Sequence, residues 1–121
     1  MALACGQEEI SIDPYHALGD WHVGWALGRQ GQIEEGLQHL DRALLLDLSR
    51  KRTLPVYVEV ARSVCEKLGC RSGDATSRLR ELTLKEGFQV YDRLYGDHEH
   101  LEPAGNEWIA TQFVELVTSA P

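Results

Sequence analysis

The feature that most constrains this fold is a helical spacing of apolar residues, which recurs along most of the chain. Val56, Val60, Val64 and Leu68 repeat every four residues, a step that places side chains on one face of a helix. The valines are β-branched and alone would favour a strand, but this period indicates a helix. Similar periods occur before and after this segment, with little strand signal. The sequence therefore predicts a mainly α chain with little or no sheet.

Residues that favour helix ends divide this pattern into separate helices. Thr53 suits an N-cap and Pro55 suits the first turn of a helix that should end at Gly69. Asp74 suits the N-cap of the next helix, and Gly87 suits its end. The stretch that follows, "FQVYDRLY", is expected to be extended or a loop.

A final helix is expected to begin at Pro103. Proline is favoured in the first turn because its fixed φ suits a helix and its missing N–H is not needed there. The expected inner face comprises Ile109, Phe113, Leu116 and Val117. We expect this face to pack on the core.

The composition indicates an ordinary globular chain and excludes two kinds of partner. The chain has 121 residues, enough for one domain with a real core, and 43% of them are hydrophobic. Its net charge of -7 would repel nucleic-acid phosphates, so we expect no nucleic-acid partner. No apolar stretch approaches the roughly 20 residues of a membrane span, so none is expected.

The start of the chain and its cysteines bear on location. The stretch "MALACGQEE" lacks the charged and apolar regions of a secretory signal, and it does not read as the beginning of a domain. Cys5, Cys65 and Cys70 are odd in number, which suits a reducing compartment better than a disulfide framework. We therefore expect buried or inert thiols and favour a cytoplasmic location. Closely spaced cysteine pairs of the kind that bind structural zinc are absent.

Residues 17–48 form two helical halves on either side of Gly31, which is suited to end the first half in a left-handed conformation. The two halves resemble a tetratricopeptide repeat, a helix–turn–helix unit of about 34 residues. The positions that carry this resemblance are Val23, Gly24, Leu27, Gly31, Leu40, Ala43 and the stretch "LLLDL". Gly36 and Leu48 depart from it, because the repeat usually has Ala and Pro there.

Pro14 lies one repeat length before Leu48, so residues 10–14 resemble the tail of a preceding repeat. A single repeat usually needs neighbours to bury its apolar face. We expect a tetratricopeptide-like hairpin with this tail over residues 1–50 and a second segment over residues 51–121. A generic helical hairpin is the alternative interpretation of the first segment.

A dense group of charge and imidazole, Asp97-His98-Glu99-His100, stands immediately before the final helix. Asp97 and His100 are three residues apart, so the carboxylate can reach back to a ring nitrogen. Such a bond fixes the tautomer of the ring and stabilises the imidazolium during proton transfer. Taken alone, the pattern D-x-x-H has little specificity.

The surrounding pattern, D-x-x-H-L-x-P-x-G-N-x-x-I-A, closely resembles the last block of the SGNH or GDSL-type esterases and lipases. In that family the block supplies the Asp and His of a Ser-His-Asp triad. The resemblance implies that Asp97 orients His100 and that His100 is the general base and acid. It also matches Gly105 and Ala110 to a Gly and a small residue of the family's following helix. The similarity extends over residues 52–117, where the helices match the C-terminal segment of an α/β hydrolase, and it implies no cofactor and no metal.

The departures from that family concern the other half of the active site. No Gly-Asp-Ser block occurs, and "LGDW" has Trp21 where the nucleophilic serine is needed. The Gly and Gly-x-Asn-Asp blocks that bind the oxyanion are also absent, as is a G-x-S-x-G elbow. A histidine base without a nucleophile has little to act on. We therefore expect a fragment of a serine esterase, inactive alone, whose full-length form acts on an ester or acylated substrate.

Two further interpretations remain open. A non-catalytic helical module could present a concave surface to a peptide or protein, with Trp21, Trp25 and Trp108 lining it and an acidic surface favouring basic partners. A metal site could also be built from Asp97, His98, His100 and Glu102, although no fixed helical pair of ligands is present. The other histidines, His16, His22 and His39, are isolated in the sequence and are expected to be ordinary surface or core residues.

Overall fold

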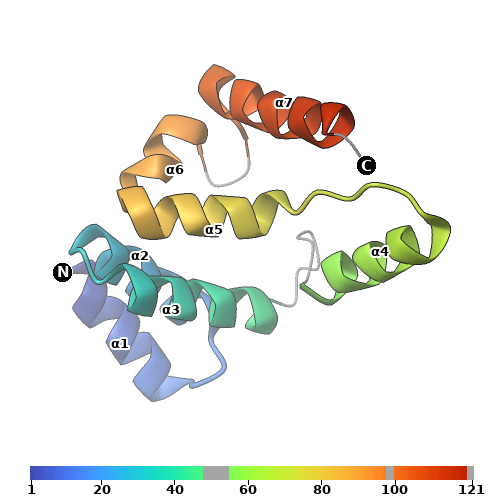
Figure 1. Cartoon of the computed structure of the whole chain (residues 1–121). Helices are drawn as coiled ribbons and strands as arrows, with labels where there is room; N and C mark the ends of the chain where they lie inside the picture. Colours follow the sequence, from blue (N-terminus) through green and yellow to red (C-terminus); the bar gives the residue numbers. More distant parts are fainter. Residues whose placement is uncertain (48–54, 98–99, 120–121) are drawn as a thin grey trace. The chain divides into compact units, whose positions relative to one another are not determined.

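The computed structural model describes residues 1–47, 55–97 and 100–119, and over these residues the chain is all-helical (Figure 1). The expectation of a mainly α chain is confirmed, and no strand occurs in the described ranges. The helices are α1 (Ala2–Ile12), α2 (Ala17–Arg29), α3 (Ile33–Leu46), α4 (Pro55–Leu68), α5 (Ala75–Glu86), α6 (Gln89–Leu94) and α7 (Pro103–Thr118). The helices form two compact units, Met1–Leu54 and Pro55–Pro121. None of the helices in these ranges is both long and apolar enough to cross a membrane.

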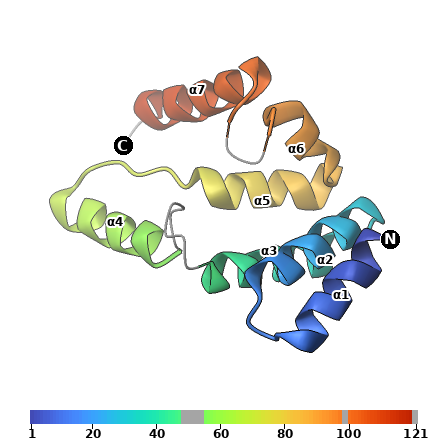
Figure 2. The ribbon, with the colours of Figure 1, turned by 180° about the vertical axis from the view of Figure 1, so that it is seen from behind.

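The first unit consists of α1, α2 and α3, with α2 packed between its two neighbours (Figure 2). Gly31 has a φ of 88°, which confirms that the chain turns there in a left-handed conformation. Helices α2 and α3 approach so closely that a Cβ on Gly36 would lie 2.7 Å from the carbonyl oxygen of Gly24. The alanine usual at this position would therefore not fit without separating the helices.

Helix α1 is absent from the sequence-based expectation, in which the first helix begins at Ala17. It ends at Ile12, and its C-cap, Asp13, stands immediately before Pro14. Gly6 is buried, and a Cβ there would lie 2.9 Å from the carbonyl oxygen of Gly19 on α2. A small-residue contact of this kind leaves little apolar periodicity, which explains why α1 was missed.

Two acid–histidine pairs join the helices of this unit. Asp20 is fully buried on α2, and its Oδ1 lies 2.8 Å from His39 Nδ1 on α3. Its Oδ2 has no hydrogen-bond partner, but Arg42 Nε lies 3.4 Å away and compensates the charge. Glu9 on α1 lies 2.9 Å from His22 Nδ1 on α2. His22 and His39 are thus structural residues, and their partners, 13 and 19 residues away, could not be predicted from the local sequence.

Helix α4 opens the second unit and has the expected ends. Pro55 is its first residue, and Gly69 follows its last residue with a φ of 67°. The expected cap, Thr53, lies outside the described residues. No residue of α4 is buried. Its apolar face is exposed through Val56, Tyr57, Val60, Val64 and Leu68.

Asp74 caps α5 as the sequence predicts. Its Oδ1 accepts the Ser77 backbone N–H at 3.0 Å, and its Oδ2 accepts the Ser77 hydroxyl at 2.7 Å. Arg62 of α4 also donates to Oδ2 at 2.9 Å. The hydrogen bonds from the Ser77 hydroxyl and backbone hold the pKa of Asp74 below its usual value. Burial opposes them less strongly, and the Arg62 charge adds a still smaller lowering effect.

The core of the second unit surrounds α6. Phe88, Val90 and Leu94 are almost completely buried, together with Thr83 of α5. The expectation that "FQVYDRLY" is extended or a loop was wrong, because residues 89–94 form a helix. Val90 and Leu94 lie one turn apart on it and are both buried. A helix this short is stabilised by tertiary packing rather than by its own propensity.

Helix α7 begins at Pro103 as expected, but its expected inner face is not buried. Ile109 and Leu116 are half-buried, whereas the Phe113 and Val117 residues are 65% and 58% exposed. Only the first turns of α7 lie close to the core, where Gly105 is buried. The expected burial of Phe113 was therefore wrong.

The cysteines also differ from the expectation of buried or inert thiols, because two of them are joined. Cys65 and Cys70 form a disulfide, with their Cα atoms 4.8 Å apart, and Cys5 is an exposed thiol. The left-handed turn at Gly69 brings the end of α4 back toward Cys70, whose backbone N–H donates to the Cys65 carbonyl at 2.9 Å. Local turn geometry, rather than the number of cysteines, brings this pair together.

Candidate functional site

The candidate acid–histidine pair lies in a tightly closed loop between α6 and α7. Tyr95 and Leu101 form an isolated antiparallel bridge at the base of this loop. The Gly96 N–H donates to the His100 carbonyl at 2.9 Å, and the Glu102 N–H donates to the Leu94 carbonyl at 2.9 Å. These backbone bonds hold the two ends of the loop together and so position His100 close to Asp97.

Asp97 and His100 face each other, as the sequence spacing predicts. The Asp97 Oδ2 atom lies 2.8 Å from His100 Nδ1, and Oδ1 lies 3.1 Å from the same nitrogen. A carboxylate in this position accepts a hydrogen bond only from a ring whose Nδ1 is protonated. The His100 side chain is 80% exposed and the Asp97 side chain 50% exposed, so solvent screens the attraction between them.

Asp97 has a second role in the loop. Its Oδ1 accepts the backbone N–H of His100 at 2.7 Å, as in turns closed by an Asp side chain. One carboxylate therefore holds both the backbone and the ring of the same histidine. The neighbouring residues lie outside the described residues; they are Glu99 and His98, one ligand of the metal interpretation. Within the described ranges, no three His, Cys, Asp or Glu residues are grouped as metal ligands would be.

Gly105 provides the contact that sets α7 against this loop. The space beside its Cα is filled by neighbouring atoms. An added Cβ would overlap the Leu94 carbonyl oxygen and lie 2.7 Å from a Leu101 methyl carbon. Any larger residue would push α7 away from α6 and from the loop. Ala110, the other small residue of the pattern, is exposed.

Tyr95 lies at the base of the loop, beside Gly96. Burial raises the pKa of its phenol, so it remains neutral over a wider pH range than an exposed tyrosine. Its ring centroid lies 6.1 Å from that of Tyr91 on α6. This aromatic contact stabilises the end of α6 from which the loop departs.

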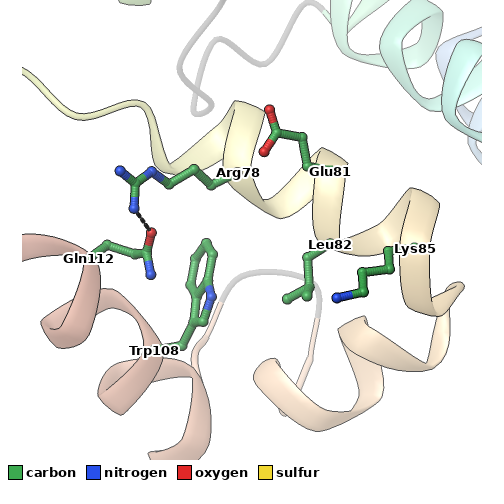
Figure 3. A pocket seen from close by; sticks show the side chains of 6 residues that line it. All are labelled: Arg78, Glu81, Leu82, Lys85, Trp108 and Gln112. Carbon is green, nitrogen blue, oxygen red and sulfur yellow. Dashed lines mark hydrogen bonds between the residues drawn. The ribbon is translucent and has the colours of Figure 1, made fainter. Parts of the chain in front are cut away.

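A groove lies between α5 and α7, apart from the Asp97–His100 loop (Figure 3). This groove has a volume of about 460 Å³ and is lined by Arg78, Glu81, Leu82, Lys85, Trp108 and Gln112. Arg78 bridges its two walls, donating to the Gln112 side-chain oxygen and to Glu115 Oε2 at 2.9 Å. This groove was not predicted from the sequence, although the spacing of Arg78, Leu82 and Lys85 places them on one helical face.

Comparisons with protein-family models, curated proteins and solved structures find no match to this chain.

Proposed function

We propose that this chain is part of a serine ester hydrolase of the SGNH type, in which it supplies the Asp–His half of a Ser-His-Asp triad. The observation that carries the proposal is the 2.8 Å distance between Asp97 Oδ2 and His100 Nδ1. In such a triad the carboxylate holds Nδ1–H and stabilises the imidazolium, while Nε2 exchanges a proton with the serine. His100 would be the general base and acid, and Asp97 would orient it.

Two packing features support this proposal. Only glycine fits where α7 meets Leu94, and the SGNH family that the chain resembles also has a glycine at the position of Gly105. The apolar faces of α4 and α7 are exposed at residues such as Val60 and Phe113. In a larger hydrolase domain, helices with such faces would be covered by further structure, as apolar patches of this kind usually are.

The chain by itself should lack esterase activity under this proposal. The Gly-Asp-Ser block and the oxyanion-binding blocks do not occur in it. Removing a single oxyanion donor typically lowers kcat by about 10²–10³-fold, and a missing nucleophile removes the acyl-transfer route itself. The substrate is an ester or acylated compound bound by the complete enzyme.

The first test measures the tautomer of His100 by nitrogen-15 NMR. We expect the Nδ1–H form to predominate among neutral rings, because Asp97 accepts from that nitrogen. Asp97→Ala should shift the ring toward the Nε2–H form. Glu102→Gln removes a charge in the same loop but keeps the Asp97 contact, so it should leave the tautomer unchanged. An unchanged tautomer in Asp97→Ala would remove the observation that carries the proposal.

The second test concerns the nucleophile. We expect a Gly-Asp-Ser block in the coding region upstream of Met1, in frame or in an adjacent gene. Expression of both parts together should hydrolyse p-nitrophenyl acetate, and His100→Ala should abolish the serine-dependent burst. Activity that survives both His100→Ala and Asp97→Asn would contradict the assigned roles, as would an upstream region without such a block.

The alternative candidate is a non-catalytic module that binds peptides through the α2–α3 hairpin. The close α2–α3 approach at Gly24 and Gly36 favours it, because it makes the hairpin a rigid unit. Trp21 and Trp25 are half-buried on α2 with ring centroids 6.0 Å apart. A basic peptide library should be enriched on the chain and lose that enrichment on Trp21→Ala. An esterase fragment should show no such preference.

A further inference from the structure

The groove between α5 and α7 combines an apolar floor with a cation that is unpaired among the described residues. Arg78, Leu82 and Lys85 follow the i, i+4, i+7 spacing that places side chains along one helix face. Trp108 and Gln112 are one turn apart on α7 and form the opposite wall. Figure 3 shows the Trp108 ring and the Leu82 methyl groups projecting into the space between these helices.

Lys85 is the positively charged group of the groove that remains available to a ligand. Among the described residues it makes no hydrogen bond or ion pair. In Figure 3 its ammonium group lies beside Leu82, on the side of α5 that faces Trp108. Arg78 differs, because Glu115 and Gln112 already accept its hydrogen bonds. The two positive residues lie at opposite ends of the apolar floor. The helical rise per residue places them about 10 Å apart along α5.

The negative groups of this region are placed so that an anion at Lys85 remains favourable. Glu81 lines the groove, but in Figure 3 its carboxylate projects from the side of α5 away from Trp108. The Glu115 carboxylate is paired with Arg78 at the other end. A ligand carboxylate beside Lys85 would therefore meet an uncompensated positive charge in a chain whose net charge is -7.

We propose that this groove binds a small arylalkyl carboxylate, with its ring against Trp108 and Leu82 and its carboxylate on Lys85. The volume of about 460 Å³ lies within the range of sites that hold small organic ligands. An aromatic ring can stack on the Trp108 indole in an offset or edge-to-face arrangement. The Gln112 amide, whose oxygen accepts from Arg78, presents its nitrogen as a further donor. This site is separate from the Asp97–His100 pair and does not depend on ester hydrolysis.

The test uses the complete chain and three ligands that share one ring and one alkyl linker. The ligands are 3-phenylpropanoate, the neutral 3-phenylpropanamide and the cationic 3-phenylpropylammonium. The readout is the indole N–H signal of Trp108 in a nitrogen-15 spectrum, with Trp21 and Trp25 of the other unit as internal controls. We expect 3-phenylpropanoate to shift the Trp108 signal saturably at millimolar concentration. The amide should bind several-fold more weakly, and the ammonium compound should bind least.

Two charge variants test the role assigned to Lys85. Lys85→Gln should weaken 3-phenylpropanoate binding about 3- to 5-fold, as expected for loss of a solvent-exposed ion pair, and should leave amide binding unchanged. Glu81→Gln should change carboxylate binding less than Lys85→Gln does, because the Glu81 carboxylate projects away from Trp108 (Figure 3). Lys67→Gln, on α4, is the matched control and should have no effect.

Several outcomes would overturn this inference. One is the absence of a Trp108 shift at about 10 mM of any ligand in the series. The others are equal affinity for the carboxylate and the amide, and an unchanged carboxylate affinity in Lys85→Gln. Lys85 also stands in the last turn of α5, where a cation stabilises a helix. A purely stabilising role would change the unfolding of Lys85→Gln but would not separate the carboxylate from the amide. If Lys85→Gln alters the fold, equal affinity of the parent chain for the carboxylate and the amide is sufficient to reject the proposal.

Discussion

Asp74→Ala should destabilise the unit formed by α4–α7 by about 1–2 kcal/mol at neutral pH. Asp74 accepts two hydrogen bonds from Ser77 at the start of α5 and one from Arg62 of α4. Loss of an N-cap typically costs about 1 kcal/mol. The Arg62 side chain is 42% exposed, so solvent screening keeps the ion pair below about 1 kcal/mol.

The pH dependence of this effect has a definite sign. The folded pKa of Asp74 is lowered by its hydrogen bonds to Ser77, so folding favours the charged carboxylate. The stabilisation is fully present above the unfolded value of about 3.9 and is lost as the pH falls through the lower folded value. The difference between Asp74→Ala and the parent should therefore be constant from pH 7 to about pH 5 and shrink below about pH 4.

Urea denaturation followed by Trp108 fluorescence measures this difference within the correct unit. Trp21→Phe and Trp25→Phe, in the other unit, remove the competing signals without touching α4–α7. Asp74→Asn should lose less stability than Asp74→Ala, because Asn also caps helices well.

The result that would refute the reasoning is a free-energy difference below about 0.3 kcal/mol at pH 7, smaller than the weakest caps. A difference that persists undiminished at pH 2 would refute the charge-based part alone. Glu59→Gln removes the other, more exposed carboxylate near Arg62 and should change stability by less than about 0.5 kcal/mol.

Three further expectations concern α7 and the candidate triad. Gly105→Ala should cost about 1–3 kcal/mol in urea denaturation, because its Cβ would overlap the Leu94 carbonyl; a neutral effect would show that α7 can shift freely. Phe113→Ala should cost less than about 1 kcal/mol, because Phe113 is 65% exposed, and a loss of about 3–5 kcal/mol would indicate full burial instead. The chain alone should hydrolyse p-nitrophenyl acetate no faster than free imidazole at equal histidine concentration; a burst removed by a serine-directed inhibitor would contradict this.

Several helix ends could be predicted from the sequence because local chemistry determines them. Gly31, Gly69 and Gly87 all have positive φ, and each follows or closes a helix where the sequence predicts an end. Asp74 and Pro103 begin their helices for equally local reasons, a capping carboxylate and a fixed φ. These features depend on the few residues around each position, so distant contacts do not change them.

The Asp97–His100 contact was also predictable, since three residues of chain in a turn bring the two side chains within reach. The acid–histidine contacts of the first unit were not. Asp20 and His39 are 19 residues apart, and they meet only because α2 and α3 pack as an antiparallel pair. A pattern of residue types over one or two turns contains no information about such a pair.

Which apolar face becomes buried was decided by tertiary packing. Val60 and Phe113 have the periodicity of core residues, yet both are exposed, whereas Val90 and Leu94 in the unexpected α6 are almost completely buried. Periodicity shows that a helix has an apolar face, but burial requires another element to cover it. The sequence by itself thus determined the helical character, the helix ends and the local acid–histidine contact. The three-dimensional packing determined the core and the groove between α5 and α7, because both depend on which helices lie against each other.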